Sequence, residues 1–142
     1  MDYRKLISEA DVINAISDAR SLELFKAIAQ TNSNSDTFRK KIKLTRKQYY
    51  SRMSRMTRVG LIKRKSGTYF LTSLGKVVYQ AEAMIEGALN DYWKLKAIDS
   101  LELSEKLSKQ DYDKIISDLI ENRELKRVLT AQQQKVLPQS SE

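Results

Sequence analysis

The hydrophobic period of the chain changes at Gly60, and this change limits the possible folds more than any other feature of the sequence. Before Gly60, apolar residues recur at the three- and four-residue steps of an amphipathic helix: Tyr49, Met53 and Met56. After it, two short runs of alternating character flank Ser66-Gly67, which is typical of a β-hairpin. We therefore expect a helix over 45–59 that leads directly into a hairpin over 61–72.

Local signals mark both ends of the 45–59 helix. Thr45 and Gln48 form the T-x-x-Q pattern of a capping box, in which each side chain binds the backbone N–H of the other residue. Leu44 and Tyr49 fit the hydrophobic staple that accompanies such a box. Gly60 stands where a helix commonly ends in a left-handed residue, so the helix is expected to stop there.

The register of the hairpin follows from its turn, which sets Arg64 opposite Tyr69 and Ile62 opposite Leu71. Three consecutive cations lie in the first run: Lys63, Arg64 and Lys65. They either protect an exposed strand edge against aggregation or share a phosphate-contacting role with the basic helix before them. We favour the shared role because the helix and the hairpin are directly connected.

Two shorter helices are expected before this helix and hairpin. The apolar residues of the first, over 18–31, recur on one face: Leu22, Phe25, Ile28 and Ala29. The polar run after it ends that helix, and Ser35 can cap a second, short helix. Within the second helix, Phe38 and Ile42 are four residues apart and are expected to face inward together.

The positive charge of the chain is concentrated in one stretch. The net charge is +8, from 26 basic and 18 acidic residues, and no acidic residue occurs over 37–81. That stretch carries 13 of the basic residues, which leaves the other 13 with all 18 acidic residues and a net charge of −5 outside it. A local positive potential of this kind suits a polyanion, whereas a merely solvated surface would mix both signs.

The outward side of the 45–59 helix has the chemistry of a nucleic-acid contact. It collects cations, hydroxyls and one aromatic side chain, without a carboxylate: Lys47, Tyr50, Ser51, Ser54, Arg55 and Arg58. Such a face can lie against phosphates and reach base edges, although surface helices are also basic by chance. Arg52 lies nearer the core edge, so local pairing is as good an interpretation for it as DNA contact.

Several classes of function are disfavoured by what the sequence lacks. Without cysteine or histidine, the chain has no disulfides, no thiol nucleophile and none of the usual transition-metal ligands. Glycine-rich phosphate loops and nucleophile-elbow motifs are also missing, so we expect neither an enzyme nor a cofactor. No signal peptide and no apolar run of about 20 residues is evident, which predicts a cytoplasmic protein without membrane association.

Three stretches carry a resemblance that goes beyond local patterns: Leu44-Thr45-Arg46-Lys47-Gln48-Tyr49-Tyr50-Ser51-Arg52, Met56 through Val59-Gly60-Leu61-Ile62-Lys63-Arg64, and Tyr69-Phe70-Leu71-Thr72-Ser73-Leu74-Gly75-Lys76. The G-L-I-x-R step into the hairpin and the Y-x-L-T-x-x-G-K exit from it are moderately specific together. The chain resembles archaeal winged helix-turn-helix transcriptional regulators of the ArsR/MarR-like kind, over about residues 19–98. The absence of cysteine and histidine argues against the metal-sensing branch of that group.

The resemblance implies that 45–59 is a recognition helix for the major groove of double-stranded DNA and that 61–72 is a wing on adjacent backbone or minor groove. The first two turns of the helix would reach base edges, and Arg55 and Arg58 would grip the backbone. The residues expected to contact DNA are Lys41, Lys43, Thr45, Arg46, Lys47, Gln48, Tyr50, Ser51, Ser54, Arg55, Arg58, Lys63, Arg64 and Lys65.

The second half of the chain predicts a helix over 73–98 with an a/d heptad pattern. The heptad positions are Leu74, Val78, Ala81, Ile85, Ala88, Tyr92 and Leu95. These residues pack either on a second copy of the chain or on a C-terminal helix over 108–129, and both can hold at once. We favour a two-fold homodimer, because symmetric pairs are the commonest oligomers.

The expected architecture is therefore mainly α with a small β-hairpin: a winged helix-turn-helix followed by a long helix and a C-terminal helix. It divides into an N-terminal helical extension (1–17), a DNA-binding domain (18–72), a dimerisation region (73–131) and a tail (132–142). The expected function is sequence-specific DNA-binding transcriptional regulation, with no effector identified. Two alternatives remain: a non-specific nucleic-acid or chromatin-associated protein, and a winged helix that serves as a protein-interaction module.

Overall fold

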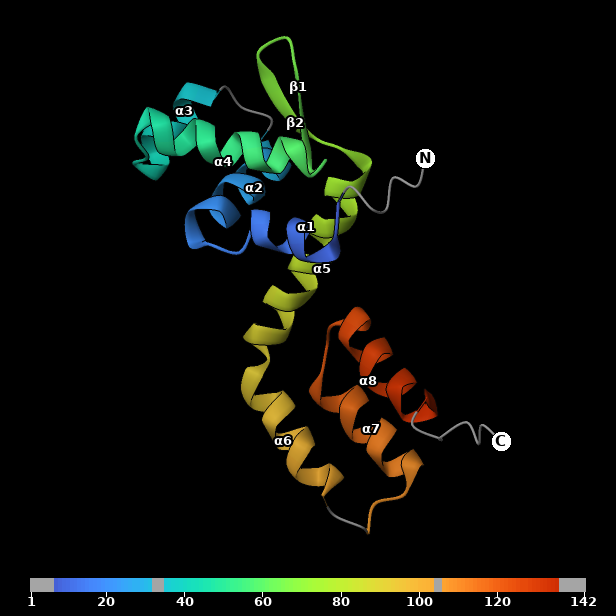
Figure 1. Ribbon diagram of the computed structural model, residues 1–142. Helices are drawn as coiled ribbons and strands as arrows, with labels where there is room; N and C mark the ends of the chain where they lie inside the picture. The colour runs from blue at the N-terminus through green and yellow to red at the C-terminus, as the bar shows by residue number, and fades with distance from the viewer. Residues whose placement is uncertain (1–6, 32–34, 104–105, 136–142) are drawn as a thin grey trace, which may run out of the picture. The chain divides into compact units, whose positions relative to one another are not determined.

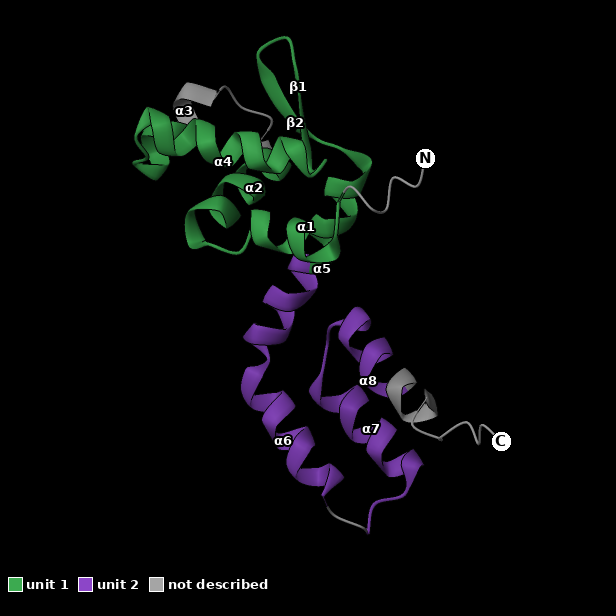
Figure 2. Cartoon of the chain, viewed as in Figure 1, with its two compact units in different colours: residues 1–81 green, residues 82–142 purple. Residues whose placement is uncertain are grey.

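The computed structural model describes residues 7–31, 35–103 and 106–135, which are mainly helical with one two-stranded antiparallel sheet (Figure 1). The chain divides into two compact units, residues 1–81 and 82–142 (Figure 2). The elements in chain order are α1 (Glu9–Ala15), α2 (Ala19–Thr31), α3 (Ser35–Ile42), α4 (Arg46–Arg58), β1 (Ile62–Lys65), β2 (Thr68–Leu71), α5 (Ser73–Asn90), α6 (Tyr92–Glu102), α7 (Lys109–Leu119) and α8 (Arg123–Lys135).

The core of the first unit joins its helices to the hairpin. Its large, fully buried side chains come from α2, α4 and the start of β1: Leu24, Phe25, Ile28, Tyr49, Met53, Met56, Leu61 and Ile62. Ala15 of α1 is also fully buried, and Val78 and Tyr79 of α5 pack against the same core. The first unit therefore extends at both ends beyond the predicted 18–72 domain, because α1 and the first turns of α5 belong to its core.

Helix α4 begins and ends as its sequence predicts. The capping box is complete, since the Gln48 backbone N–H donates to Thr45 Oγ1 at 3.2 Å and the Thr45 N–H donates to Gln48 Oε1 at 3.0 Å. At the other end, Gly60 has a φ of +83°. The Leu61 N–H donates to the Met56 carbonyl and the Gly60 N–H to the Thr57 carbonyl, both at 3.0 Å, which is the Schellman arrangement.

The hairpin has the predicted register, with Ile62 opposite Leu71 and Arg64 opposite Tyr69. Its two turn residues, Ser66 and Gly67, have φ values of +52° and +78°. Positive φ values at both central positions are typical of the two-residue turn whose twist matches that of the flanking strands.

Helix α2 forms over almost the predicted range, but its inward face differs. Leu24 is fully buried together with Phe25 and Ile28, whereas Leu22 and Ala29 are only half-buried. Helix α2 contacts α3 and β2 and shares its core with residues of α4 and with Tyr79 of α5, so the buried arc is set by neighbours that the local period does not specify. In α3, the helix includes Ser35. The predicted Ser35 cap and the inward Phe38 lie outside the residues whose side chains the structure describes.

The predicted continuous helix over 73–98 is wrong, because α5 ends at Asn90 and α6 begins at Tyr92. The Asp91 N–H is shared between the carbonyls of Gly87 (3.2 Å) and Ala88 (3.1 Å), and its carboxylate pairs with Lys94 at 3.7 Å. Asparagine and aspartate form helix interiors poorly because their short side chains compete with the backbone for hydrogen bonds, and two of them stand together at this break.

The predicted single helix over 108–129 is also wrong, because α7 and α8 are separate. Ile120 has extended backbone angles, and Asn122 caps α8 by accepting hydrogen bonds from the N–H groups of Glu124 at 2.9 Å and Leu125 at 3.2 Å. The turn lets Ile116, Ile120 and Leu125 all enter one core. A single straight helix could not fold its second half back onto its first.

The core of the second unit consists of Ile98, Tyr112, Ile116, Ile120 and Leu125, with Met84, Ala88 and Leu95 packed against it. The Tyr112 hydroxyl donates to Glu102 Oε1 at 2.5 Å, and burial together with that carboxylate raises the pKa of Tyr112. Among the described residues, no helix is both long and apolar enough to cross a membrane.

Candidate nucleic-acid interface

The outward face of α4 carries most of the residues predicted to contact DNA. Its side chains are exposed, as are those of the connection before it and of the hairpin, so every residue predicted to contact DNA has an exposed side chain. Tyr50, the aromatic residue of this face, is 48% exposed and stacks edge-on against the buried Tyr49, with 5.2 Å between ring centroids. The face therefore combines exposed cations with one aromatic ring that packs against a core residue.

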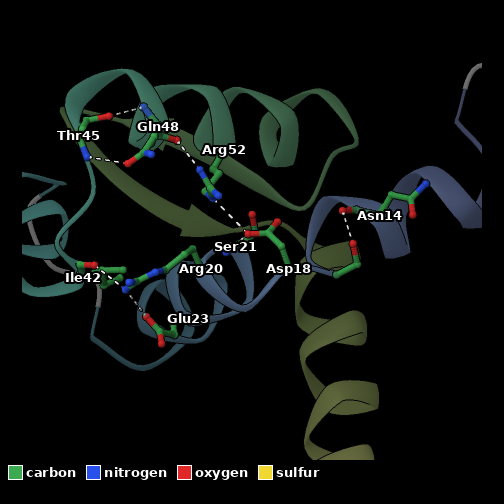
Figure 3. Close-up of polar contacts among 10 residues, drawn as sticks. Asn14, Asp18, Arg20, Ser21, Glu23, Ile42, Thr45, Gln48 and Arg52 are labelled. Carbon is green, nitrogen blue, oxygen red and sulfur yellow. Dashed lines mark hydrogen bonds and ion pairs between the residues drawn. The ribbon is translucent and has the colours of Figure 1, made fainter.

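Two of the predicted contact residues also have a structural task. Thr45 and Gln48 are bonded to one another in the capping box, which occupies the Gln48 side-chain oxygen and the Thr45 hydroxyl (Figure 3). The amide nitrogen of Gln48 is left to act as a donor toward a partner. While the cap is intact, the Gln48 amide nitrogen keeps its two donors, and one acceptor site of its oxygen is already occupied.

Arg52 is paired within the chain. Its Nε donates to Asp18 Oδ2 at 3.2 Å and its Nη1 to the Gln48 carbonyl at 3.3 Å (Figure 3). Partial burial acts to raise the pKa of Asp18, but hydrogen bonds from Ser21 and the Arg52 pair outweigh it and the pKa falls below its ordinary 3.8. The contact joins α4 to the residue directly before α2. Arg52 therefore stabilises the packing of α4 at the edge of its outward face.

Arg20 of α2, for which the sequence predicted no role, stabilises the turn between α3 and α4. Its Nη1 donates to the Ile42 carbonyl at 2.7 Å, at the end of α3, and lies 3.9 Å from Glu23 (Figure 3). Lys43, which directly follows Ile42, has a φ of +59°. The bond holds the turn from which α4 begins, but no local pattern in the sequence links Arg20 to a carbonyl 22 residues later.

The three cations of the hairpin do not share a face. Arg64 lies on the same side of the sheet as Ile62, and its guanidinium is 5.6 Å from the centroid of the Tyr69 ring. Lys63 and Lys65 lie on the other side, because successive side chains of a strand alternate. The alternation can be read from the sequence and separates Arg64 from the two lysines, while the role shared with the basic helix stays a prediction.

Acidic residues from outside the acid-free stretch approach the basic face in space. Besides Asp18, Asp11 of α1 lies near Arg58. Hydrogen bonds from Ser8 lower the pKa of Asp11, and the positive charge of Arg58 adds a smaller effect. A depression of about 570 Å³ borders both α1 and the end of α4 and is lined by Ile7, Asp11, Asn14, Ser17, Arg55, Arg58 and Val59.

A polar joint fixes the hairpin between α4 and α5. The Thr72 hydroxyl donates to the Gly60 carbonyl and accepts from the Gly75 N–H at 3.0 Å, while the Thr72 N–H donates to the Leu61 carbonyl at 3.0 Å. All three partners belong to the two sequence steps that enter and leave the hairpin. The joint therefore determines where the hairpin stands beside α4.

No cluster of metal-ligating side chains occurs in the part of the chain that the structure describes. Comparison of the chain with protein-family models, with curated proteins and with solved structures gives no match. Over the described residues the fold is mainly helical with one small antiparallel sheet.

Proposed function

We propose that the chain is a sequence-specific, double-stranded DNA-binding transcriptional regulator of winged helix-turn-helix type. In this proposal α4 is the recognition helix, and β1 and β2 form the wing. The observation that carries the proposal is the outward face of α4, which is exposed along its length and has cations and hydroxyls but no carboxylate of its own.

The order of elements supports the proposal. Three helices, α2 to α4, are followed at once by an antiparallel hairpin, which is the order of a winged helix. An α-helix fits the major groove of B-DNA, where each base pair presents a distinct set of donors and acceptors. Arg46, Lys47 and Ser51 lie in the first two turns and are assigned to base edges and nearby phosphates, while Arg55 and Arg58 are assigned to the backbone.

A salt titration of duplex binding tests the proposal. We expect Lys47→Ala with Arg55→Ala to weaken binding and to lower the slope of log affinity against log salt by about 2, since each lost phosphate contact removes about 0.9. The matched control is Lys109→Ala with Lys114→Ala on α7, which removes the same charge from exposed positions of the second unit. A double variant of α4 with the slope and affinity of the wild type would contradict the assignment.

Competition with random duplex separates specific from general binding. A specific regulator is expected to prefer its site by about 10³-fold or more over random sequence. Equal competition by all duplexes would instead indicate a non-specific nucleic-acid protein. A chain that shifts no duplex at low salt would indicate a protein-interaction module.

We also propose that the regulator is a homodimer. Of the predicted heptad positions, Val78, Ala88 and Leu95 pack within their own chain, whereas Leu74, Ala81, Ile85 and Tyr92 are exposed. Leu89 and Trp93, which the heptad count omitted, are 64% and 80% exposed. A dimer on an inverted repeat would place two recognition helices about 34 Å apart, one DNA turn.

A further inference from the structure

The side of the hairpin that carries Lys63 and Lys65 borders a groove to which α4 contributes no residue. The groove holds about 670 Å³ and lies between the hairpin, α2 and α5. We call it the lysine groove and define it by its lining residues: Ile28, Ala29, Lys63, Lys65, Phe70, Leu71, Lys76, Tyr79 and Gln80.

Three lysines line the groove, Lys63 and Lys65 from β1 and Lys76 from the first turn of α5. No carboxylate lines it, and over the described ranges of the chain none forms an ion pair with any of the three lysines. Like charges held on one concave surface repel one another, so a multiply charged anion is the complementary ligand.

The floor of the groove is apolar and partly aromatic. Ile28 is buried, and Phe70, Leu71 and Tyr79 are half-buried. The Tyr79 ring is fixed from two sides, by edge-on contact with Phe25 at 6.3 Å between centroids and by a 3.4 Å hydrogen bond from Gln30 Nε2 to its hydroxyl. A fixed aromatic ring beside an apolar strand suits a flat ring system, while an inorganic anion would leave this surface uncovered.

We propose that the lysine groove binds a phosphate group attached to a planar base, as in a mononucleotide. The lysines would hold the phosphate as point charges, and the base would lie on the surface of Phe70 and Tyr79. The volume lies within the range of small-molecule sites. The phosphate can belong to a free nucleotide or to a nucleic-acid strand, and both have the same chemistry at this site.

Titration of the full chain with adenosine 5′-monophosphate, followed by amide NMR shifts, tests the proposal. We expect shifts to concentrate at Lys65, Phe70, Lys76 and Tyr79, and ribose 5-phosphate to bind about tenfold more weakly because it lacks the base. Lys63→Gln with Lys76→Gln should lower the affinity for the nucleotide about tenfold or more. The matched control, Lys109→Gln with Lys114→Gln at exposed positions of α7, removes the same charge and should leave affinity for the nucleotide unchanged.

Three outcomes would overturn the site: no shifts at millimolar nucleotide, shifts spread equally over α4, or equal losses in the groove and control variants. A short duplex identifies the source of the phosphate. A duplex that displaces the nucleotide from the groove would identify the DNA backbone as the ligand. A duplex that binds the chain without displacing the nucleotide would identify a free nucleotide as the ligand. Because the nucleotide titration needs no DNA, its failure is distinguishable from failure of the proposed regulator function.

Discussion

At the scale of single residues, Gly75 allows α5 to begin directly beside the start of β1. A Cβ added at Gly75 would lie 2.1 Å from the Leu61 carbonyl oxygen, a backbone atom that cannot move aside alone. We expect Gly75→Ala to destabilise the fold by about 2–3 kcal/mol and to lower Tm by roughly 10 °C. Gly67→Ala is the control, since its Cβ meets open space and only its positive φ is strained, at about 1 kcal/mol. Equal melting temperatures for the two variants would contradict the close approach.

Asp18 links folding to pH through the cap of α2 and the brace to Arg52. Its pKa is lowered in the folded chain, so it contributes stability above its ordinary value of 3.8 and loses that contribution as pH falls through the folded value. We expect Asp18→Asn to melt below the wild type at pH 7, and the gap to narrow as the pH falls below 3.8. Thermal melts by circular dichroism between pH 7 and pH 3 measure this. A gap that stays constant would show that charge at Asp18 contributes nothing.

The residues that sequence predicted well are those whose partners are close in the chain. Thr45, Gln48 and Gly60 act within one helix, so their spacing alone specifies their bonds. The bonds from Arg52 to Asp18 and from Arg20 to the Ile42 carbonyl join separate helices, and no period or motif encodes them. The exposure of the outward face of α4 could be predicted from the sequence, but the contacts of Arg52 and Arg20 that support the helix could not.

At the scale of elements, α4 and the hairpin follow the sequence closely, and the helices of the second unit do not. In α4 the cap, the apolar stripe and the terminal glycine all specify the same helix. Across Asp91 and across Ile120 the apolar positions continue with helical spacing, so a count of hydrophobic periods cannot detect either break. The informative signals were the polar pair at 90–91 and the cap residue Asn122.

Asn122 therefore offers a test of how α8 begins. Its side chain accepts two backbone hydrogen bonds, from Glu124 and Leu125, that Asn122→Ala would remove. We expect Asn122→Ala to cost about 1 kcal/mol and to expose these two amides to faster hydrogen exchange. Asn122→Asp keeps the acceptor and should retain most of the protection. If the alanine variant exchanges no faster, the cap does not hold the helix end.

At the scale of the whole molecule, charge separates along the sequence more cleanly than it does in space. The stretch over 37–81 has no acidic residue, yet the fold brings Asp18 to Arg52 and Asp11 near Arg58. These contacts place negative charge beside two of the arginines of α4, which lowers the local positive potential there. The surface proposed to contact DNA is therefore narrower than the basic stretch on which the prediction was based.

The apolar surface of the second unit is the strongest argument for a homodimer. Ile85, Leu89, Tyr92 and Trp93 are 62%, 64%, 45% and 80% exposed, although Met84, Ala88 and Leu95 of the same helices already pack on the core. Helices that are apolar on two sides need cover on both, and an isologous pair would supply it.

We expect light scattering at micromolar concentration to give twice the chain mass, and Ile85→Asp with Leu89→Asp to give the single-chain mass with an unchanged helical spectrum. Gln110→Asp with Ser117→Asp adds the same charge at exposed positions of α7 and should leave the dimer intact. A wild-type chain that is monomeric under these conditions would refute the pairing, and loss of the dimer in both double variants would trace it to charge instead of to this apolar surface.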